Sequence, residues 1–249
     1  MGGMATLQGI RKDVHFEVMR HSLPHLAWAL ALALLAACGG QEPGPAAQGT
    51  PIAATVAQSG GPGLAELRGG QLPAARAQFE VKLRANPDQM AALNDLALTY
   101  YLEGRFEAAR QLLDEVVAKG VALEQQAALV NLAELCALDG YVSAAQAYLE
   151  SARGIDATRA EPVYALALLA DGRGDGEASR LVREALALDA EGSARRALAF
   201  VYPEERSHLE ALVADATGDR AAALVHWREL KAGRFSSLAL AAQRHLEEP

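Results

Sequence analysis

The residues able to do chemistry are few in this chain and widely scattered. The chain has six histidines, namely His15, His21, His25, His208, His226 and His245. The first three lie near the N-terminus, and the last three share no His-x-x-x-His or Cys-x-x-Cys spacing of the kind that binds zinc. We therefore expect no metal site, and we interpret His226 beside Trp227 as a helix-surface residue.

One glycine-rich stretch, residues 172–176, could in principle hold a phosphate. Phosphate loops follow a strand and continue into Gly-Lys-Ser/Thr, and neither feature is present here. A Gly-x-Ser-x-Gly nucleophile motif is also missing from the sequence. The stretch is best interpreted as a turn between two helices. The sequence predicts a non-enzymatic protein without a cofactor.

The two cysteines have different contexts. Cys38 directly follows an apolar run over residues 26–37. This run is 12 residues long and too short to span a bilayer. The run and its small terminal residues are typical of a secretory signal peptide. Leu35-Ala36-Ala37-Cys38 resembles a bacterial lipobox, which implies cleavage before Cys38 and a lipid on its thiol. Residues 1–37 are then the signal peptide, with Met19 as an alternative start.

The residues after Cys38 indicate an anchored protein with a spacer. Gly39 stands where an aspartate retains lipoproteins in the inner membrane of well-studied Gram-negative systems. By analogy, we expect the periplasmic face of the outer membrane. Residues 38–62 are rich in Gly, Pro, Gln and Ala, so we predict a flexible tether there.

Composition indicates what kind of domain follows the tether. Apolar residues make up 51% of the chain and aromatics only 5%, because alanine and leucine dominate. That balance favours helices over sheets. A formal net charge of −8 with no basic stripe argues against nucleic-acid binding.

A repeat of about 34 residues organises the region from residue 63 onward. Glycines at 70, 104, 140, 174 and 218 are each followed four or five residues later by alanine. The clearest copy runs from Asn86 to Gly120. Its Leu93, Leu96, Ala97 and Tyr100 lie on one helical face. Gly104 then ends this helix, and Ala109 lies on the next one. Towards the C-terminus, helices are expected over roughly residues 193–202, 204–216, 220–231 and 236–248.

This pattern resembles the tetratricopeptide repeat (TPR), in which small residues let paired helices cross closely. The resemblance implies an all-α, TPR-like α-solenoid over 63–249, with about four to five helical hairpins and a C-terminal capping helix; an irregular helical bundle is the alternative. Cys136 replaces a core tyrosine and should be buried and inert. The predicted repeat core is Leu93, Leu96, Ala97, Tyr100, Gly104, Ala109, Leu132, Ala133, Cys136, Gly140, Ala145, Gly174 and Ala178.

In TPR proteins the first helix of each pair lines a concave groove. The matched positions here are Asn94, Leu98, Tyr101, Val130, Asn131, Glu134, Tyr164, Leu168 and Asp171. They include no lysine or arginine, so a peptide carboxylate clamp is not expected. A partner helix or extended segment with apolar anchors and some basic residues would suit this groove. The alternative is that Leu98 and Tyr101 simply pack against a neighbouring repeat.

The resemblance implies a protein-binding scaffold with other envelope proteins as partners, such as an outer-membrane complex or a secretin. Pilotin-type lipoproteins and gliding-motility lipoproteins are similar in kind. A regulatory cofactor of a periplasmic cell-wall enzyme is the alternative. We expect no small-molecule substrate and no bound group other than the lipid on Cys38.

Overall fold

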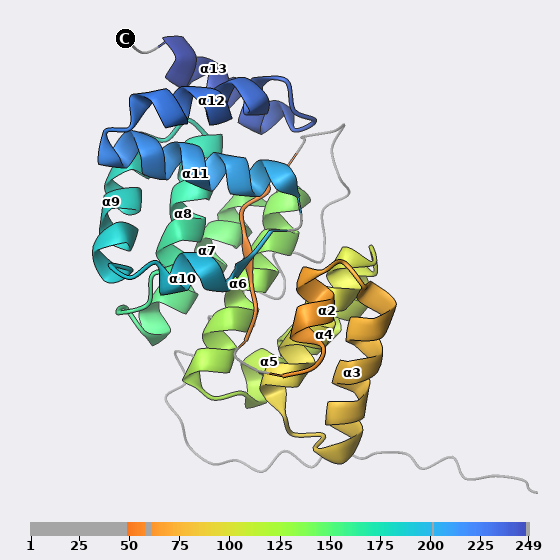
Figure 1. Ribbon diagram of the computed structural model, residues 1–249. Helices are drawn as coiled ribbons and strands as arrows, with labels where there is room; N and C mark the ends of the chain where they lie inside the picture. Colours follow the sequence, from red (N-terminus) through yellow and green to blue (C-terminus); the bar gives the residue numbers. More distant parts are fainter. Residues whose placement is uncertain (1–48, 58–60, 201, 248–249) are drawn as a thin grey trace, which may run out of the picture.

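The computed structural model describes residues 49–57, 61–200 and 202–247. Its helices confirm the predicted all-α architecture. Residues 64–188 form four consecutive hairpins (Figure 1). Their helices are α2 (Leu64–Arg68) with α3 (Leu72–Ala85), α4 (Met90–Leu102) with α5 (Phe106–Lys119), α6 (Ala122–Leu138) with α7 (Val142–Ile155), and α8 (Glu161–Gly172) with α9 (Ala178–Leu188).

The glycines at the bends adopt the conformation that the repeat requires. Gly104 has φ +75°, where a side chain would be strained. The N–H of Arg105 donates to the carbonyl of Tyr100 at 2.8 Å, which closes the end of α4. The same bond forms after the positive-φ glycines at 70, 140, 174 and 218. Each hairpin therefore turns in the same way.

Alanine fills the tight places between the helices. Ala97, Ala109, Ala133 and Ala145 are all fully buried, as is Cys136. Helices can approach closely at such positions because the side chains are small, and interiors are packed to high density. The inner helices α4, α6 and α8 are buried on nearly every face. An open solenoid would leave one face of these helices exposed, so something must cover it here.

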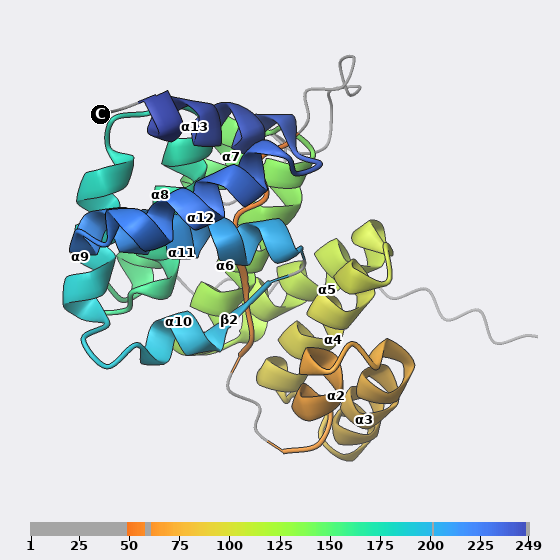
Figure 2. The ribbon, with the colours of Figure 1, turned by 45° about the horizontal axis from the view of Figure 1, so that its top comes forward.

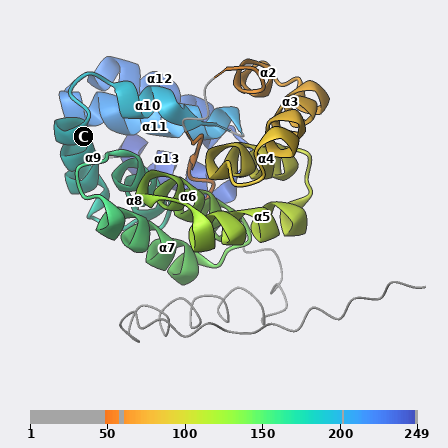
Figure 3. The ribbon, with the colours of Figure 1, turned by 90° about the horizontal axis from the view of Figure 1, so that it is seen from below.

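Two parts of the chain provide that cover. The C-terminal helices are α11 (Pro203–Thr217), α12 (Arg220–Lys231) and α13 (Ser236–Glu247), and they lie across the curved row of hairpins (Figures 1 and 3). Helix α11 contacts α8 and α9, and α13 contacts α12 and α8. The predicted capping helix thus also reaches back to an inner helix.

The second cover is residues 49–57, called the groove segment below. It contains β1 (Ala54–Thr55), which pairs antiparallel with β2 (Leu198–Ala199), and Ala54 lies opposite Ala199. The prediction of a flexible tether over 38–62 is wrong for these residues. The helix expected over 193–202 is also shorter than predicted, because α10 (Ser193–Ala197) ends where β2 begins.

The remaining N-terminal predictions concern other parts of the chain. The signal peptide over residues 1–37, the lipidation of Cys38 and the tether up to residue 48 lie outside the described residues. Among the helices that the structure describes, none combines the length and the apolar character needed to cross a membrane.

Candidate partner-binding groove

The groove segment lies extended along the inner helices, from the C-terminal end of α6 towards α4 (Figures 1 and 2). Near its start, the Thr50 N–H donates to the carbonyl of Ala137 at 3.1 Å. The Ile52 N–H donates to Glu134 Oε2 at 2.7 Å. At the other end, the Ala57 N–H donates to Asp95 Oδ1 at 2.9 Å. Side chains of the array therefore bind the main chain of the segment.

The centre of the segment is held by an amide pair. Asn131 Oδ1 accepts from the Thr55 N–H at 2.7 Å, and Asn131 Nδ2 donates to the Thr55 carbonyl at 3.0 Å. Asn94 Nδ2 also donates to that carbonyl at 3.4 Å. Asn131 further donates to Asn94 Oδ1 at 3.0 Å. Side chains from two consecutive repeats, α4–α5 and α6–α7, therefore both bind Thr55. All these groups are buried, where an unpaired polar atom is costly.

Apolar contacts fix the same segment. Ile52 is fully buried, and Ala53, Ala54, Val56 and Ala57 are buried too. The segment docks closely at its start, because a Cβ built on Gly49 would lie 1.9 Å from the Leu138 carbonyl oxygen. A Cβ built on Gly172 would lie 2.2 Å from Thr50 Cγ2. The groove and the segment are thus complementary in shape as well as in hydrogen bonding.

A buried carboxyl cluster connects the groove segment to the C-terminal helices. Besides Ile52, Glu134 accepts a hydrogen bond from Tyr101 Oη at 2.9 Å, and it hydrogen-bonds with Glu205 of α11. Burial raises the pKa of Glu134 to about 7, and the hydrogen bonds from Ile52, Tyr101 and Glu205 only partly oppose that rise. Burial beside Glu134 also raises the pKa of Tyr101, which stays protonated as a donor.

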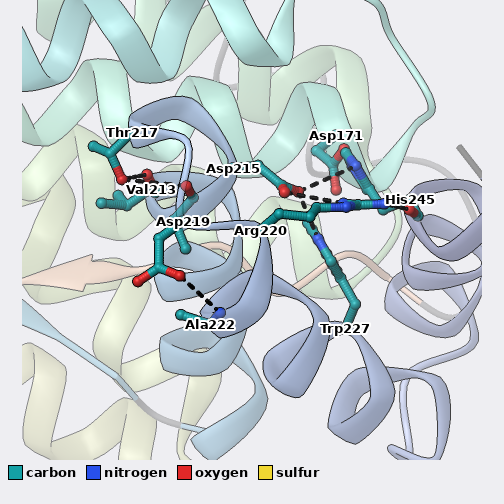
Figure 4. Close-up of polar contacts among 10 residues, drawn as sticks. Asp171, Val213, Asp215, Thr217, Asp219, Arg220, Ala222, Trp227 and His245 are labelled. Carbon is teal, nitrogen blue, oxygen red and sulfur yellow. Dashed lines mark hydrogen bonds and ion pairs between the residues drawn. The ribbon is translucent and has the colours of Figure 1, made fainter. Parts of the chain in front are cut away.

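A second cluster ties α11 and α13 to the inner helix α8. Asp171 Oδ2 lies 2.7 Å from His208 Nε2, and Asp171 Oδ1 lies 2.7 Å from His245 Nε2. Trp227 stacks on His245 at 4.1 Å, and its Nε1 donates to Asp215 at 2.7 Å (Figure 4). Burial opposes ionisation of Asp171, but the hydrogen bonds and charges of the two histidines hold its pKa well below the usual range.

This cluster unites residues that are distant in sequence. His208 and His245 lie 37 and 74 residues from Asp171, so spacing rules could not bring them together. In the part of the chain that the structure describes, no group of three or more His, Cys, Asp or Glu is arranged to hold a metal ion. The role of the cluster is structural, because it joins the C-terminal helices α11 and α13 to the inner helix α8. His226, predicted on a helix surface, lies partly exposed between Glu210 and Glu229.

All nine residues predicted to line the groove are buried. Asn94, Asn131 and Glu134 bind the groove segment directly. Tyr101 supports Glu134, Asp171 joins the C-terminal cluster, and Tyr164 donates to Asp189 at 3.3 Å. Leu98, Val130 and Leu168 belong to the apolar core. Sequence reasoning missed Asp95, because it follows Asn94 and does not occupy a matched position.

An open cavity of about 940 Å³ adjoins one end of the groove segment. Val56 of the segment lines it together with Leu198 and Ala199 of β2. Its other walls come from α2, α4, α10 and α11 and the loops beside them, and they include Arg68, Arg195, Arg196 and Arg206. The segment is therefore reachable from outside at its Val56 end.

The hairpin geometry, the bend glycines and the inner-helix groove together define a TPR-type α-solenoid. Among solved structures, the chain is similar to TTC0263, a thermophilic TPR protein of Thermus thermophilus, with 23% identity and a TM-score of 0.51 over 74% of this chain and 95% of that one. A crystal structure of MamA has 18% identity and a TM-score of 0.42 over 74% of this chain and 96% of that one, which is too low to add weight. No protein-family model matches the chain. No curated protein matches it in sequence either.

Proposed function

We propose that this chain is a non-enzymatic scaffold that binds a partner protein through the concave groove of its TPR array. The observation that carries the proposal is the way in which Asn131, Glu134 and Asp95 hold the main chain of an extended segment. Contacts to main-chain N–H and C=O groups give affinity for extended peptides in general, and neighbouring pockets select the side chains. The groove is thus built to bind peptide.

The proposal includes a membrane anchor on Cys38. It is supported by the apolar run at 26–37 and by the lipobox-like Leu35-Ala36-Ala37-Cys38. Several acyl chains at one residue would hold the protein stably, since each buried CH₂ contributes about 0.8 kcal/mol and one chain alone is marginal. With Gly39 after the cysteine, we place the protein on the periplasmic face of the outer membrane.

In this setting the scaffold serves the assembly or operation of an envelope machine, such as a gliding-motility apparatus or a pilus or secretin complex. The test is crosslinking in intact cells, followed by purification of the full-length protein from detergent-solubilised membranes. Recovery of an integral outer-membrane complex supports the proposal. Recovery of a cell-wall hydrolase alone would instead support a regulatory cofactor and contradict the scaffold.

The anchor is tested separately with Cys38→Ser. We expect the variant to be lost from the outer-membrane fraction and to migrate differently on a gel, because it keeps its apolar signal segment and carries no lipid. A matched control is Cys136→Ser, which changes the other cysteine, a buried one inside α6. A Cys38→Ser protein that stays in the membrane and migrates unchanged would contradict the anchor.

A further inference from the structure

The groove that we propose for the partner is already filled by the chain's own residues 49–57. The segment contributes four of its main-chain N–H groups, those of Thr50, Ile52, Thr55 and Ala57, to bonds with the helices. Its Ile52 is the largest side chain that it buries completely. A partner cannot reach Asn131 or Glu134 while this segment remains in place.

An empty groove would be unstable, which limits how a partner can enter. Asn94, Asp95, Asn131 and Glu134 are each at most 4% exposed, and all of them contact the segment. Removal of the segment alone would leave these groups without their main-chain partners, and each such loss is destabilising. Replacement by another extended segment would restore every bond. Exchange is therefore favoured over simple opening.

The cavity beside Val56 offers a place for the exchange to begin. It borders both the segment and β2, so an incoming chain could first contact Leu198 and Ala199 and then replace β1 residue by residue. Adding an extended segment to a strand edge is a common way for proteins to bind peptides, and the edge of β2 that pairs with β1 becomes available where β1 leaves it. Each main-chain hydrogen bond that the groove segment loses is re-formed by the incoming peptide.

We propose, building on the proposed function, that residues 49–57 are an internal ligand of the TPR groove and that the partner binds by displacing them. The partner segment is extended and uncharged in the groove. It carries an aliphatic residue at the Ile52 position and small or β-branched residues elsewhere, as in Ile52-Ala53-Ala54-Thr55-Val56. It has no proline at the positions of Thr50, Ile52, Thr55 and Ala57, because proline has no N–H to donate.

The first test locks the segment in place in the full chain purified in detergent. Ala54→Cys combined with Ala199→Cys places two thiols across an antiparallel pair. Such pairs have Cα atoms about 4.5–5.5 Å apart, which suits a disulfide. The probe is a fluorescent peptide with the sequence of residues 49–57. We expect at least tenfold weaker binding when the pair is oxidised than when it is reduced, with wild type under both conditions as the control.

The second test releases the segment. Ile52→Asp introduces a charge at a fully buried position, so the segment should leave the groove. Because a tethered competitor acts at millimolar effective concentration, we expect the variant to bind the peptide at least tenfold more tightly than wild type. Val81→Asp changes an exposed aliphatic residue on α3 and serves as the matched control. A probe with proline in place of Thr55 should not bind.

Equal binding of the peptide to the oxidised and reduced proteins would overturn the exchange proposal. The proposal would also be overturned if the oxidised double-cysteine variant captured the cellular partner as efficiently as wild type does. That second result would leave the scaffold function standing, with the partner on another surface. If Ile52→Asp binds the peptide tightly but no partner is recovered from cells, the internal ligand is supported and the scaffold function fails. The disulfide lock needs no destabilised variant, so the test remains decisive if Ile52→Asp misfolds.

Discussion

Asn131 binds both main-chain polar groups of Thr55, accepting from its N–H at 2.7 Å and donating to its carbonyl at 3.0 Å. The two residues are 76 positions apart, and the bond joins the segment before the array to an inner helix. The side-chain amide of Asn131 thus forms the same two hydrogen bonds to Thr55 that the main chain of a neighbouring strand would form. The array therefore recognises an extended chain by its main chain, with β2 supplying a true strand beside it.

Replacing Asn131 by leucine, which has a similar size, should destabilise the protein. The change leaves the Thr55 N–H without its buried acceptor, and an unpaired buried group costs about 1–3 kcal/mol. Urea denaturation followed by circular dichroism measures the loss. Gln243→Leu on the exposed face of α13 is the control and should change stability by less than about 0.5 kcal/mol. Equal stability of the Asn131 variant and wild type would show that the segment does not depend on this contact.

Stability should fall as pH rises towards neutrality, because of Glu134. Its pKa is raised from 4.5 to about 7 in the folded protein, so the folded state holds a proton that the unfolded state has released in this range. Raising the pH from about 4.5 to 7 removes that proton and with it the associated stability.

The measurement is the free energy of unfolding at several pH values between 4.5 and 8. Glu134→Gln cannot ionise, so its stability should be flatter across this window than that of wild type. The exposed Glu107→Gln should leave the wild-type slope unchanged. A wild-type stability that increases steadily from pH 4.5 to 7 would contradict the assignment.

The four hairpins could be predicted from sequence because their signals are local. Gly104 and Ala109 lie five residues apart, and an alanine four or five residues after the glycine recurs at each bend. Helix ends and close crossings depend on such neighbours, which explains why α12 also begins and ends at the predicted residues. The all-α solenoid follows from these repeated local choices.

The groove segment could not be predicted in the same way. Its composition resembles a linker, and its partners Asn131 and Glu134 are more than 70 residues distant. The single available signal is the set of four β-branched residues, Thr50, Ile52, Thr55 and Val56, inside a stretch of glycine, proline and alanine. Likewise, Asp171 and His245 come together only because α13 folds back onto α8.

Asp171 should stabilise the attachment of the C-terminal helices at neutral pH. Its pKa is lowered in the folded state, so the stability it contributes is present above its ordinary pKa of 3.8 and is lost as the pH falls below that value. Asp171→Asn removes the buried charge that faces His208 and His245, and breaking such a pair costs about 3–5 kcal/mol.

Hydrogen exchange at pH 7 tests this prediction. Relative to wild type, Asp171→Asn should speed up amide exchange in α11 and α13 more than in α4. Asp219→Asn is a suitable control, because Asp219 is exposed and asparagine caps a helix equally well. Unchanged protection of α13 in Asp171→Asn would show that the cluster does not hold the C-terminal helices.

The close crossing of α4 and α5 should not tolerate a larger side chain at Ala109. This residue is fully buried, and leucine would add three carbons to a packed interface. Overpacking of this kind costs about 1–3 kcal/mol. Ala118→Leu makes the same change on the exposed side of α5 and should be nearly neutral. Thermal denaturation compares the two variants, and an Ala109→Leu protein with the melting temperature of Ala118→Leu would show that small residues are not required where the paired helices meet.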